Sequence, residues 1–290
     1  MSIKGGCATA SERTGSAQAF LTNKIEILRR YVGGTSAAPL GLHDYPVYDS
    51  VKRSAPSQSD IIREQIRLAQ YSSFQLIDGG INQSVVLKNG VKVVFKPKAG
   101  EDPIETNYPP GVHKGTQYLR EKAASIIDEL LGIGLVPPTE IITYEGLVGS
   151  AQVFQDSYTT ARHLEATGAI TLPCFDKLTD RQRQDWQLID ELIGNGDRHA
   201  GNWMLRSRVD GKFDLALIDN GRSFPEIGES NLFVRPASRM KIDSINRDRL
   251  ERLLTLEREW RTKLTELVGV AAIEHMINRA QKLLRQGYYE

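Results

Sequence analysis

Two apolar segments with an Asp-Gly pair between them constrain the fold of this chain more than any other local feature. Residues 203–205 and 213–218 have the composition of buried strands, and Asp210-Gly211 between them is a strong signal for a tight hairpin turn. A two-residue turn at this pair would place Asn202 directly opposite Asp219. Because cross-strand neighbours lie about 5 Å apart at their Cβ atoms, we expect two oxygen-bearing side chains to meet at the open end of the hairpin.

The residues around this hairpin have the spacing of a phosphoryl-transfer centre. Asp197 precedes Asn202 by five positions, which is the spacing of the protein-kinase catalytic loop. There the aspartate orients the acceptor hydroxyl and the asparagine holds a metal ion. Asp219-Asn220-Gly221 stands where a kinase has its metal-binding motif, and Mg²⁺ prefers oxygen ligands. Taken singly, Asp197 also fits a turn cap and Asp219 a strand end; together the three residues favour catalysis.

A second hairpin signal, Asn89-Gly90, lies in the front half between two β-rich runs. A two-residue turn there places Lys96 opposite Gln83, beside a loop that contains Gly79, Gly80 and Ser84. An ammonium group on a strand beneath such a loop can bind phosphates as a point charge. An ordinary hairpin loop is the alternative interpretation. Lys98 is the second candidate lysine, although Pro97 indicates that the strand ends near it.

A lysine in this role needs a carboxylate to orient it, and Glu121 is the candidate. Apolar spacing predicts a helix over residues 118–131 that ends at Gly132. Glu121 falls in the first turn of this helix, where an acid is also favourable for purely helical reasons. Lys122, Asp128 and Glu129 look like solvated charges on the same helix.

The order of predicted elements indicates two unlike halves. Strand patterns fill much of residues 74–154, and helical patterns cover residues 181–193, 247–267 and 271–285. We therefore expect an α+β, two-lobed protein-kinase-like fold. Its β-rich N-lobe would span residues 59–155 and its mainly helical C-lobe residues 156–290.

These segments together resemble the phosphatidylinositol 3-/4-kinase superfamily, most closely the type II phosphatidylinositol 4-kinases and their plant relatives. The similar segments are residues 94–98, 118–124, 149–154, 197–203 and 218–225. The resemblance implies that Asp197 is the catalytic aspartate and that Asn202 and Asp219 hold the metal. It also implies that Lys96 and Glu121 position ATP.

The same resemblance identifies residues 149–154 as a hinge strand, with Gln152 and Phe154 near the adenine. It implies ATP and Mg²⁺ as cofactors, with Mn²⁺ as an alternative. His199 would touch the γ-phosphate or brace its loop, and Arg198 is interpreted as structural. Arg222 is interpreted as a solvated charge, with contact to an acidic acceptor as the alternative.

The composition of the chain limits the classes of binding partner and the cellular locations that are expected for it. The chain carries 37 basic and 36 acidic side chains for a net charge of +1, which argues against a general nucleic-acid binder. Its two cysteines, Cys7 and Cys174, are far apart, which suits a reducing compartment. No apolar run approaches the roughly 20 residues that span a bilayer. We expect a protein located in the cytoplasm or secreted into a host cytosol, and not an integral membrane protein.

The residues that precede the folded body are rich in small polar side chains. Residues 1–58 are expected to form a flexible extension with one short helix over residues 18–32. The extension is either an accessory segment or the export signal of a secreted bacterial effector.

The acceptor of the phosphoryl group is the open question. Residues 97–117 contain no cysteine and no apolar wedge, unlike the palmitoylated insert of the animal type II lipid kinases. A protein Ser or Thr is therefore expected as acceptor, with a phosphoinositide lipid as the alternative. Two further alternatives are a catalytically inactive kinase-fold module that binds a partner, and another nucleotide-dependent transferase such as an adenylylating enzyme.

Overall fold

A computed structural model describes residues 57–71, 73–77, 84–102, 104, 108–172, 174–227 and 240–289. All of them belong to one unit of the chain, Pro56–Glu290. The predicted helix over residues 18–32 and the loop residues Gly79, Gly80 and Gln83 lie outside the described part. No helix in the described ranges is long and apolar enough to cross a membrane.

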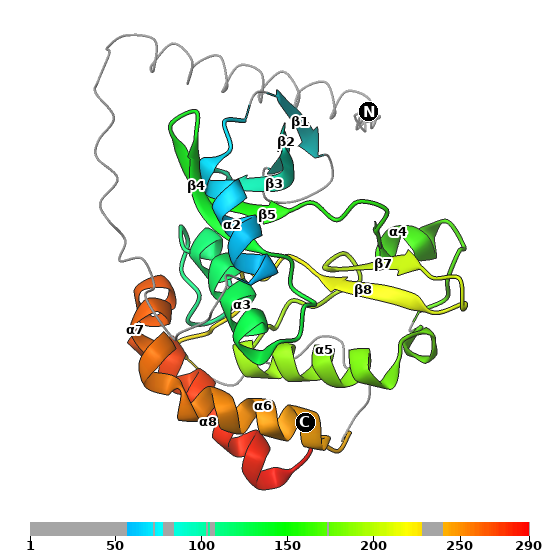
Figure 1. Ribbon diagram of the computed structural model, residues 1–290, viewed down its shortest axis with the longest axis vertical. Helices are drawn as coiled ribbons and strands as arrows, with labels where there is room; N and C mark the ends of the chain where they lie inside the picture. The colour runs from blue at the N-terminus through cyan, green and yellow to red at the C-terminus, as the bar shows by residue number, and fades with distance from the viewer. Residues whose placement is uncertain are drawn as a thin grey trace, which may run out of the picture. The chain divides into compact units, whose positions relative to one another are not determined.

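The front part is a five-stranded antiparallel sheet in the order β1-β2-β3-β5-β4 (Figure 1). Its strands are β1 Ser73–Ile77, β2 Ser84–Asn89, β3 Val91–Pro97, β4 Thr139–Tyr144 and β5 Leu147–Val153. Helices α2 (Gln58–Leu68) and α3 (Gln117–Leu131) pack on this sheet. Val93, Phe95 and Ala151 are completely or almost completely buried between the sheet and its neighbours, so the alternate apolar positions of the strands build the core.

The back part is mainly helical, with a small three-stranded sheet in the order β6-β7-β8. It contains β6 Thr159–Thr160, α4 Ala161–Ala166, α5 Asp180–Ile193, β7 Trp203–Ser207, β8 Phe213–Leu217, α6 Ser244–Thr255, α7 Glu257–Val268 and α8 Val270–Gln286, with short 3₁₀ turns at Lys98–Gly100 and Phe175–Lys177. Helix α3 contacts the five-stranded sheet as well as α5, α6 and α7 (Figure 1). The large core of this part includes Trp186, Trp203 and Trp260.

The α+β class and the order of a sheet-rich part before a helical part agree with the prediction. Helix α3 ends at Gly132, which adopts the left-handed conformation with φ of 65°. One prediction about the helices was wrong: residues 247–267 form two helices, because the backbone leaves the helical conformation at Leu256. The boundary between the lobes at residues 155 and 156 stays a prediction.

Both hairpins form where predicted, but each register differs by one residue from the predicted one. In the first, Lys88 pairs with Lys92 and Asn89 with Val91. A two-residue type I′ turn requires positive φ at both central residues, and here Gly90 has φ of 70° while Asn89 does not share this conformation. The prediction that Lys96 lies opposite Gln83 was therefore wrong. Because Val85 pairs with Phe95, the next position in this register sets Ser84 opposite Lys96.

The second hairpin closes with a three-residue loop. The N–H of Arg208 donates to the carbonyl of Lys212 at 2.9 Å, and Gly211 has φ of 75°. This is the common arrangement of a type I turn followed by a left-handed residue. Ile218 therefore faces Asn202, to whose carbonyl its N–H donates at 3.0 Å. The predicted pairing of Asn202 directly opposite Asp219 was wrong, and Asp219 lies one residue beyond the pair.

The helix charges that looked solvated are in fact paired. Lys122 contacts Glu140 at 2.7 Å, and Glu129 pairs with Arg63. The carboxylate of Asp128 is buried and accepts three backbone N–H groups, from Gly134 at 2.8 Å, Leu135 at 3.0 Å and Val136 at 3.1 Å. Asp128 thereby fixes the turn that leads from α3 into β4.

Replacing Asp128 by alanine should lower the free energy of unfolding by about 3 kcal/mol, because buried N–H groups lose a charged acceptor. Urea denaturation with an unchanged slope measures the change. Asp156→Ala is the matched control, since the Asp156 side chain is 71% exposed and should matter little. Equal stability of the two variants would contradict the role given to Asp128.

Candidate active site

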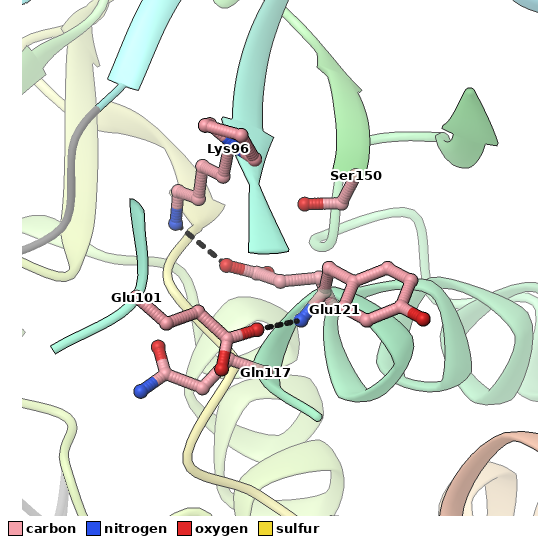
Figure 2. A pocket seen from close by; sticks show the side chains of 7 residues that line it. Lys96, Glu101, Gln117, Glu121 and Ser150 are labelled. Carbon is pink, nitrogen blue, oxygen red and sulfur yellow. Dashed lines mark hydrogen bonds and ion pairs between the residues drawn. The ribbon is translucent and has the colours of Figure 1, made fainter. Parts of the chain in front are cut away.

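Lys96 joins three separate parts of the chain. From β3 its Nζ reaches Oε1 of Glu121 on α3 at 2.6 Å and Oδ1 of Asp219, after β8, at 3.0 Å. Figure 2 shows the lysine pointing at Glu121 across a small pocket. Burial alone lowers the pKa of Lys96, but the charges of Asp219 and Glu121 outweigh it and raise the pKa overall. Lys96 is therefore a fixed positive charge.

Glu121 is buried, and both of its carboxylate oxygens have partners. While Oε1 contacts Lys96, Oε2 accepts the backbone N–H of Asn220 at 3.0 Å. Because α3 begins at Gln117, Glu121 lies in its second turn, and the first turn contains no acid. The alternative of a simple helix N-terminal charge therefore does not describe Glu121, which orients Lys96 and the loop after β8.

Asp219 adopts a backbone conformation that residues other than glycine rarely use. Its φ is 57°, and such conformations cost of order 1–3 kcal/mol and cluster at functional sites. Burial tends to raise the pKa of its carboxyl group, but adjacent Lys96 lowers it below the ordinary value overall. The carboxylate remains partly exposed and keeps its negative charge.

Asp197 and Asn202 are held together within one loop. The amide nitrogen of Asn202 donates to the backbone carbonyl of Asp197 at 2.7 Å, which leaves the amide oxygen as the group that can bind a cation. The Asp197 side chain is 22% exposed. Burial raises the pKa of Asp197, although Arg222 and His199 oppose this effect.

Arg198 ties the loop of Asp197 to the loop of Asp219. It is completely buried and pairs with Asp190 at 2.9 Å. Its remaining donors reach the carbonyls of Asn202 at 2.6 Å and Ile218 at 2.5 Å, and the side chain of Asn220 at 2.5 Å. These contacts match the predicted structural role.

His199 makes the contacts expected of a loop brace. Its Nδ1 accepts the backbone N–H of Gly201 at 3.0 Å and lies 3.2 Å from a guanidinium nitrogen of Arg162. The other ring nitrogen, Nε2, lies 4.0 Å from Oδ1 of Asp197. These contacts brace the loop, and a contact of His199 with the γ-phosphate stays a prediction.

The other predicted residues make contacts of a different kind. Lys98 falls in the 3₁₀ turn after β3, exposed, with its Nζ 6.0 Å from the ring centre of Tyr118. Ser84 begins β2. The Gln152 amide donates to Thr139 at 3.0 Å within the sheet, and the Phe154 ring lies under the ammonium group of Lys92 at 3.4 Å.

Three further residues lie near the site, and the sequence pattern did not assign any of them to it. Glu101 and Gln117 line the pocket beside Lys96 (Figure 2), and no local pattern marks either residue. Glu101 accepts the backbone N–H groups of Gly115 at 2.6 Å and Tyr118 at 3.2 Å, at the start of α3. Arg222, interpreted as solvated, lies 3.7 Å from Asp197; its position directly after the Asp219-Asn220-Gly221 motif was the available signal.

The donor set suits a cation that is shared with a phosphate. Among the described residues no group of three or more His, Cys, Asp or Glu side chains can hold a metal ion. Asn202 and Asp219 offer one amide oxygen and one carboxylate. Mg²⁺ is commonly bound by one or two such groups while substrate phosphates and water complete its shell, so these residues fit it.

Sequence comparisons point to plant kinases. No protein-family model matches the chain. It is 29% identical over 175 residues to phosphatidylinositol 4-kinase gamma 4 of Arabidopsis thaliana, covering 48% of this chain and 29% of that protein. With phosphatidylinositol 4-kinase gamma 2 of the same plant the identity is 25% over 241 residues, covering 67% and 42%. The chain thus spans less than half the length of these relatives.

Structural comparisons establish the fold. The structure of hydra Fam20 with sugar matches with a TM-score of 0.57 at 14% identity, covering 80% of this chain and 90% of that one. A crystal structure of the Golgi casein kinase matches with a TM-score of 0.50 at 16% identity, covering 78% and 73%. The chain has a two-lobed, kinase-like α+β fold, which confirms the predicted class.

The bracing role of Arg198 predicts a large loss of stability on its removal. Arg198→Ala leaves Asp190 charged and buried without its partner, which should lower the free energy of unfolding by about 3–5 kcal/mol. Chemical denaturation provides the measurement. The control is Arg206→Ala, because Arg206 pairs with Asp214 on the exposed side of β7 and should change stability little. Similar losses in both variants would refute the bracing role.

Proposed function

We propose that this protein is an ATP-dependent kinase that transfers the γ-phosphate of ATP to a hydroxyl acceptor. The observation that carries the proposal is the junction of Lys96 with Glu121 and Asp219, at 2.6 and 3.0 Å. It brings together a strand lysine, a helix acid and a metal-motif aspartate from distant parts of the sequence. Kinases need this combination in place for transfer.

Each residue of the cluster has a defined task in this proposal. Lys96 binds the phosphates of ATP, and Glu121 keeps it oriented. Asn202 and Asp219 hold Mg²⁺, which when bound neutralises charge on the phosphates. Asp197 orients the acceptor hydroxyl. Gly79, Gly80 and Ser84 are proposed to cover the phosphates, and Gln152 and Phe154 to lie near the adenine.

The proposed reaction balances as a simple displacement. The acceptor oxygen forms a bond to the γ-phosphorus while the bond from that phosphorus to the β–γ bridging oxygen breaks. The hydroxyl proton passes to Asp197, and ADP leaves with the bridging oxygen. The raised pKa of Asp197 favours a carboxylate that accepts a proton.

Two acceptor classes follow from different observations. Residues 97–117, which contain no cysteine and no apolar wedge, favour a Ser or Thr of a protein. The named plant relatives favour a phosphoinositide lipid. Both acceptors present a hydroxyl to Asp197, so the cluster serves either one.

Turnover of ATP tests the proposal directly. Asp197→Ala should lower kcat by about 10²–10⁴-fold, the usual range for loss of a catalytic acid or base, and Asp219→Ala should abolish the response to added Mg²⁺. Asp180→Ala is the control, since Asp180 is 90% exposed at the start of α5. Residual activity equal to the wild type in both site variants would reject the assignment.

Labelled nucleotides separate the proposal from its rivals. Incubation with a cell lysate and phosphoinositide vesicles should transfer label from γ-labelled ATP and none from α-labelled ATP. Label in the protein fraction identifies a protein acceptor, and label in the vesicle fraction a lipid acceptor. Transfer from the α position alone would indicate an adenylylating enzyme, and no transfer together with tight ATP binding would indicate an inactive module.

A further inference from the structure

Arg222 occupies the space next to the proposed catalytic aspartate. Its guanidinium lies 3.7 Å from Oδ2 of Asp197 and 3.9 Å from Oδ2 of Asp102. Both separations exceed the range of a hydrogen bond. Arg222 is thus attracted by two carboxylates without forming a close pair with either.

The other arginines near the site are used differently. Arg198 is completely buried, and its donors are taken by Asp190 and by groups of two loops. Arg120 is also buried and donates to the carbonyls of Ser223 and Phe224. Arg222 is 22% exposed, and within the described residues its guanidinium makes no hydrogen bond. Its planar fork of donors therefore remains available to an anionic group.

Asp102 explains why Arg222 stays in this place. Asp102 is buried, and its Oδ1 accepts the backbone N–H of Ile104 at 2.9 Å, which fixes the carboxylate. The attraction of Asp102 holds one end of the guanidinium while the other end faces Asp197. Asp102 is in this sense a positioning residue.

We infer that Arg222 donates hydrogen bonds to the phosphoryl group while that group is being transferred. The inference rests on the proposed kinase function. In the proposed reaction the group passes from ATP, held at Asn202 and Asp219, to the acceptor at Asp197, and the guanidinium of Arg222 lies 3.7 Å from Asp197. As the bond to the bridging oxygen breaks and the bond to the acceptor oxygen forms, Arg222 stabilises charge on the non-bridging oxygens. It keeps its own proton throughout, since the acceptor proton goes to Asp197.

Substitution at Arg222 tests the inference through the rate of transfer. Arg222→Ala should lower kcat on the order of 10³-fold, the lower end for an arginine at a transferring phosphoryl group, with little change in KM for ATP. Arg222→Lys should recover only part of the loss, because lysine lacks the fork. Arg208→Ala is the control: Arg208 pairs with Asp210 at the tip of the β7–β8 hairpin and should leave kcat unchanged.

Binding provides a second readout that does not depend on turnover. ADP with aluminium fluoride and Mg²⁺ imitates the transferring group, so Arg222→Ala should bind it far more weakly than the wild type while binding ADP equally well. Isothermal titration measures both affinities. Added guanidinium should restore part of the activity of Arg222→Ala, an effect that a purely structural arginine would not show. Urea denaturation confirms that the variant is folded.

The outcomes distinguish this inference from the proposed function. If the wild type binds the aluminium fluoride complex and Arg222→Ala binds it equally, the inference falls and the kinase proposal stands. A higher kcat for Arg222→Ala than for the wild type would also contradict the inference, because it would show that Arg222 inhibits Asp197. If the wild type binds neither ADP nor the aluminium fluoride complex, both fall together.

Discussion

The arrangement of this site depends on one buried carboxylate, that of Glu121. One of its oxygens holds the ammonium group of Lys96, and the other accepts the backbone N–H of Asn220. A buried charge is tolerated only when it is fully paired, and Glu121 meets this condition with partners from two other elements. The sheet, helix α3 and the loop after β8 are thereby fixed relative to one another at the point where chemistry is proposed.

The loop that begins at Asp219 shows how the fold sustains strain near the site. Asp219 and Phe224 have φ of 57° and 56°, which is unfavourable for side chains with a Cβ atom. Phe224 is completely buried, and its N–H donates to the carbonyl of Ile193 at 2.7 Å. At the other end, the contact between Lys96 and Asp219 holds the carboxylate in place. Packing and charge pairing thus offset the backbone cost and keep the aspartate beside the lysine.

The sequence predicted the elements and the pairing of Lys96 with Glu121 better than it predicted strand registers and the contacts of Asp128 and Arg222. Apolar periodicity and Gly132 defined α3, since both are local signals. The hairpin registers differed by one residue, because the turn type depends on whether Asn89 or Asp210 adopts positive φ, which residue identity alone does not decide. Asp128 and Arg222 were misjudged for another reason. Asp128 binds backbone N–H groups of the turn that follows its helix, and Arg222 faces carboxylates of two separate loops, so neither set of contacts leaves a periodic pattern.

The surroundings of the two aspartates of the site shift their pKa values in opposite directions. Lys96 lies next to Asp219, and the net effect is a pKa below the ordinary value. Asp197 has no such close cation, since Arg222 lies 3.7 Å away, and burial raises its pKa. Environments that shift two carboxyl groups in opposite directions typically assign them different roles. These opposite shifts agree with the proposed function, in which Asp219 is a metal ligand and Asp197 accepts the hydroxyl proton. The lysine beside Asp219 and the burial of Asp197 together shift the two pKa values in opposite directions.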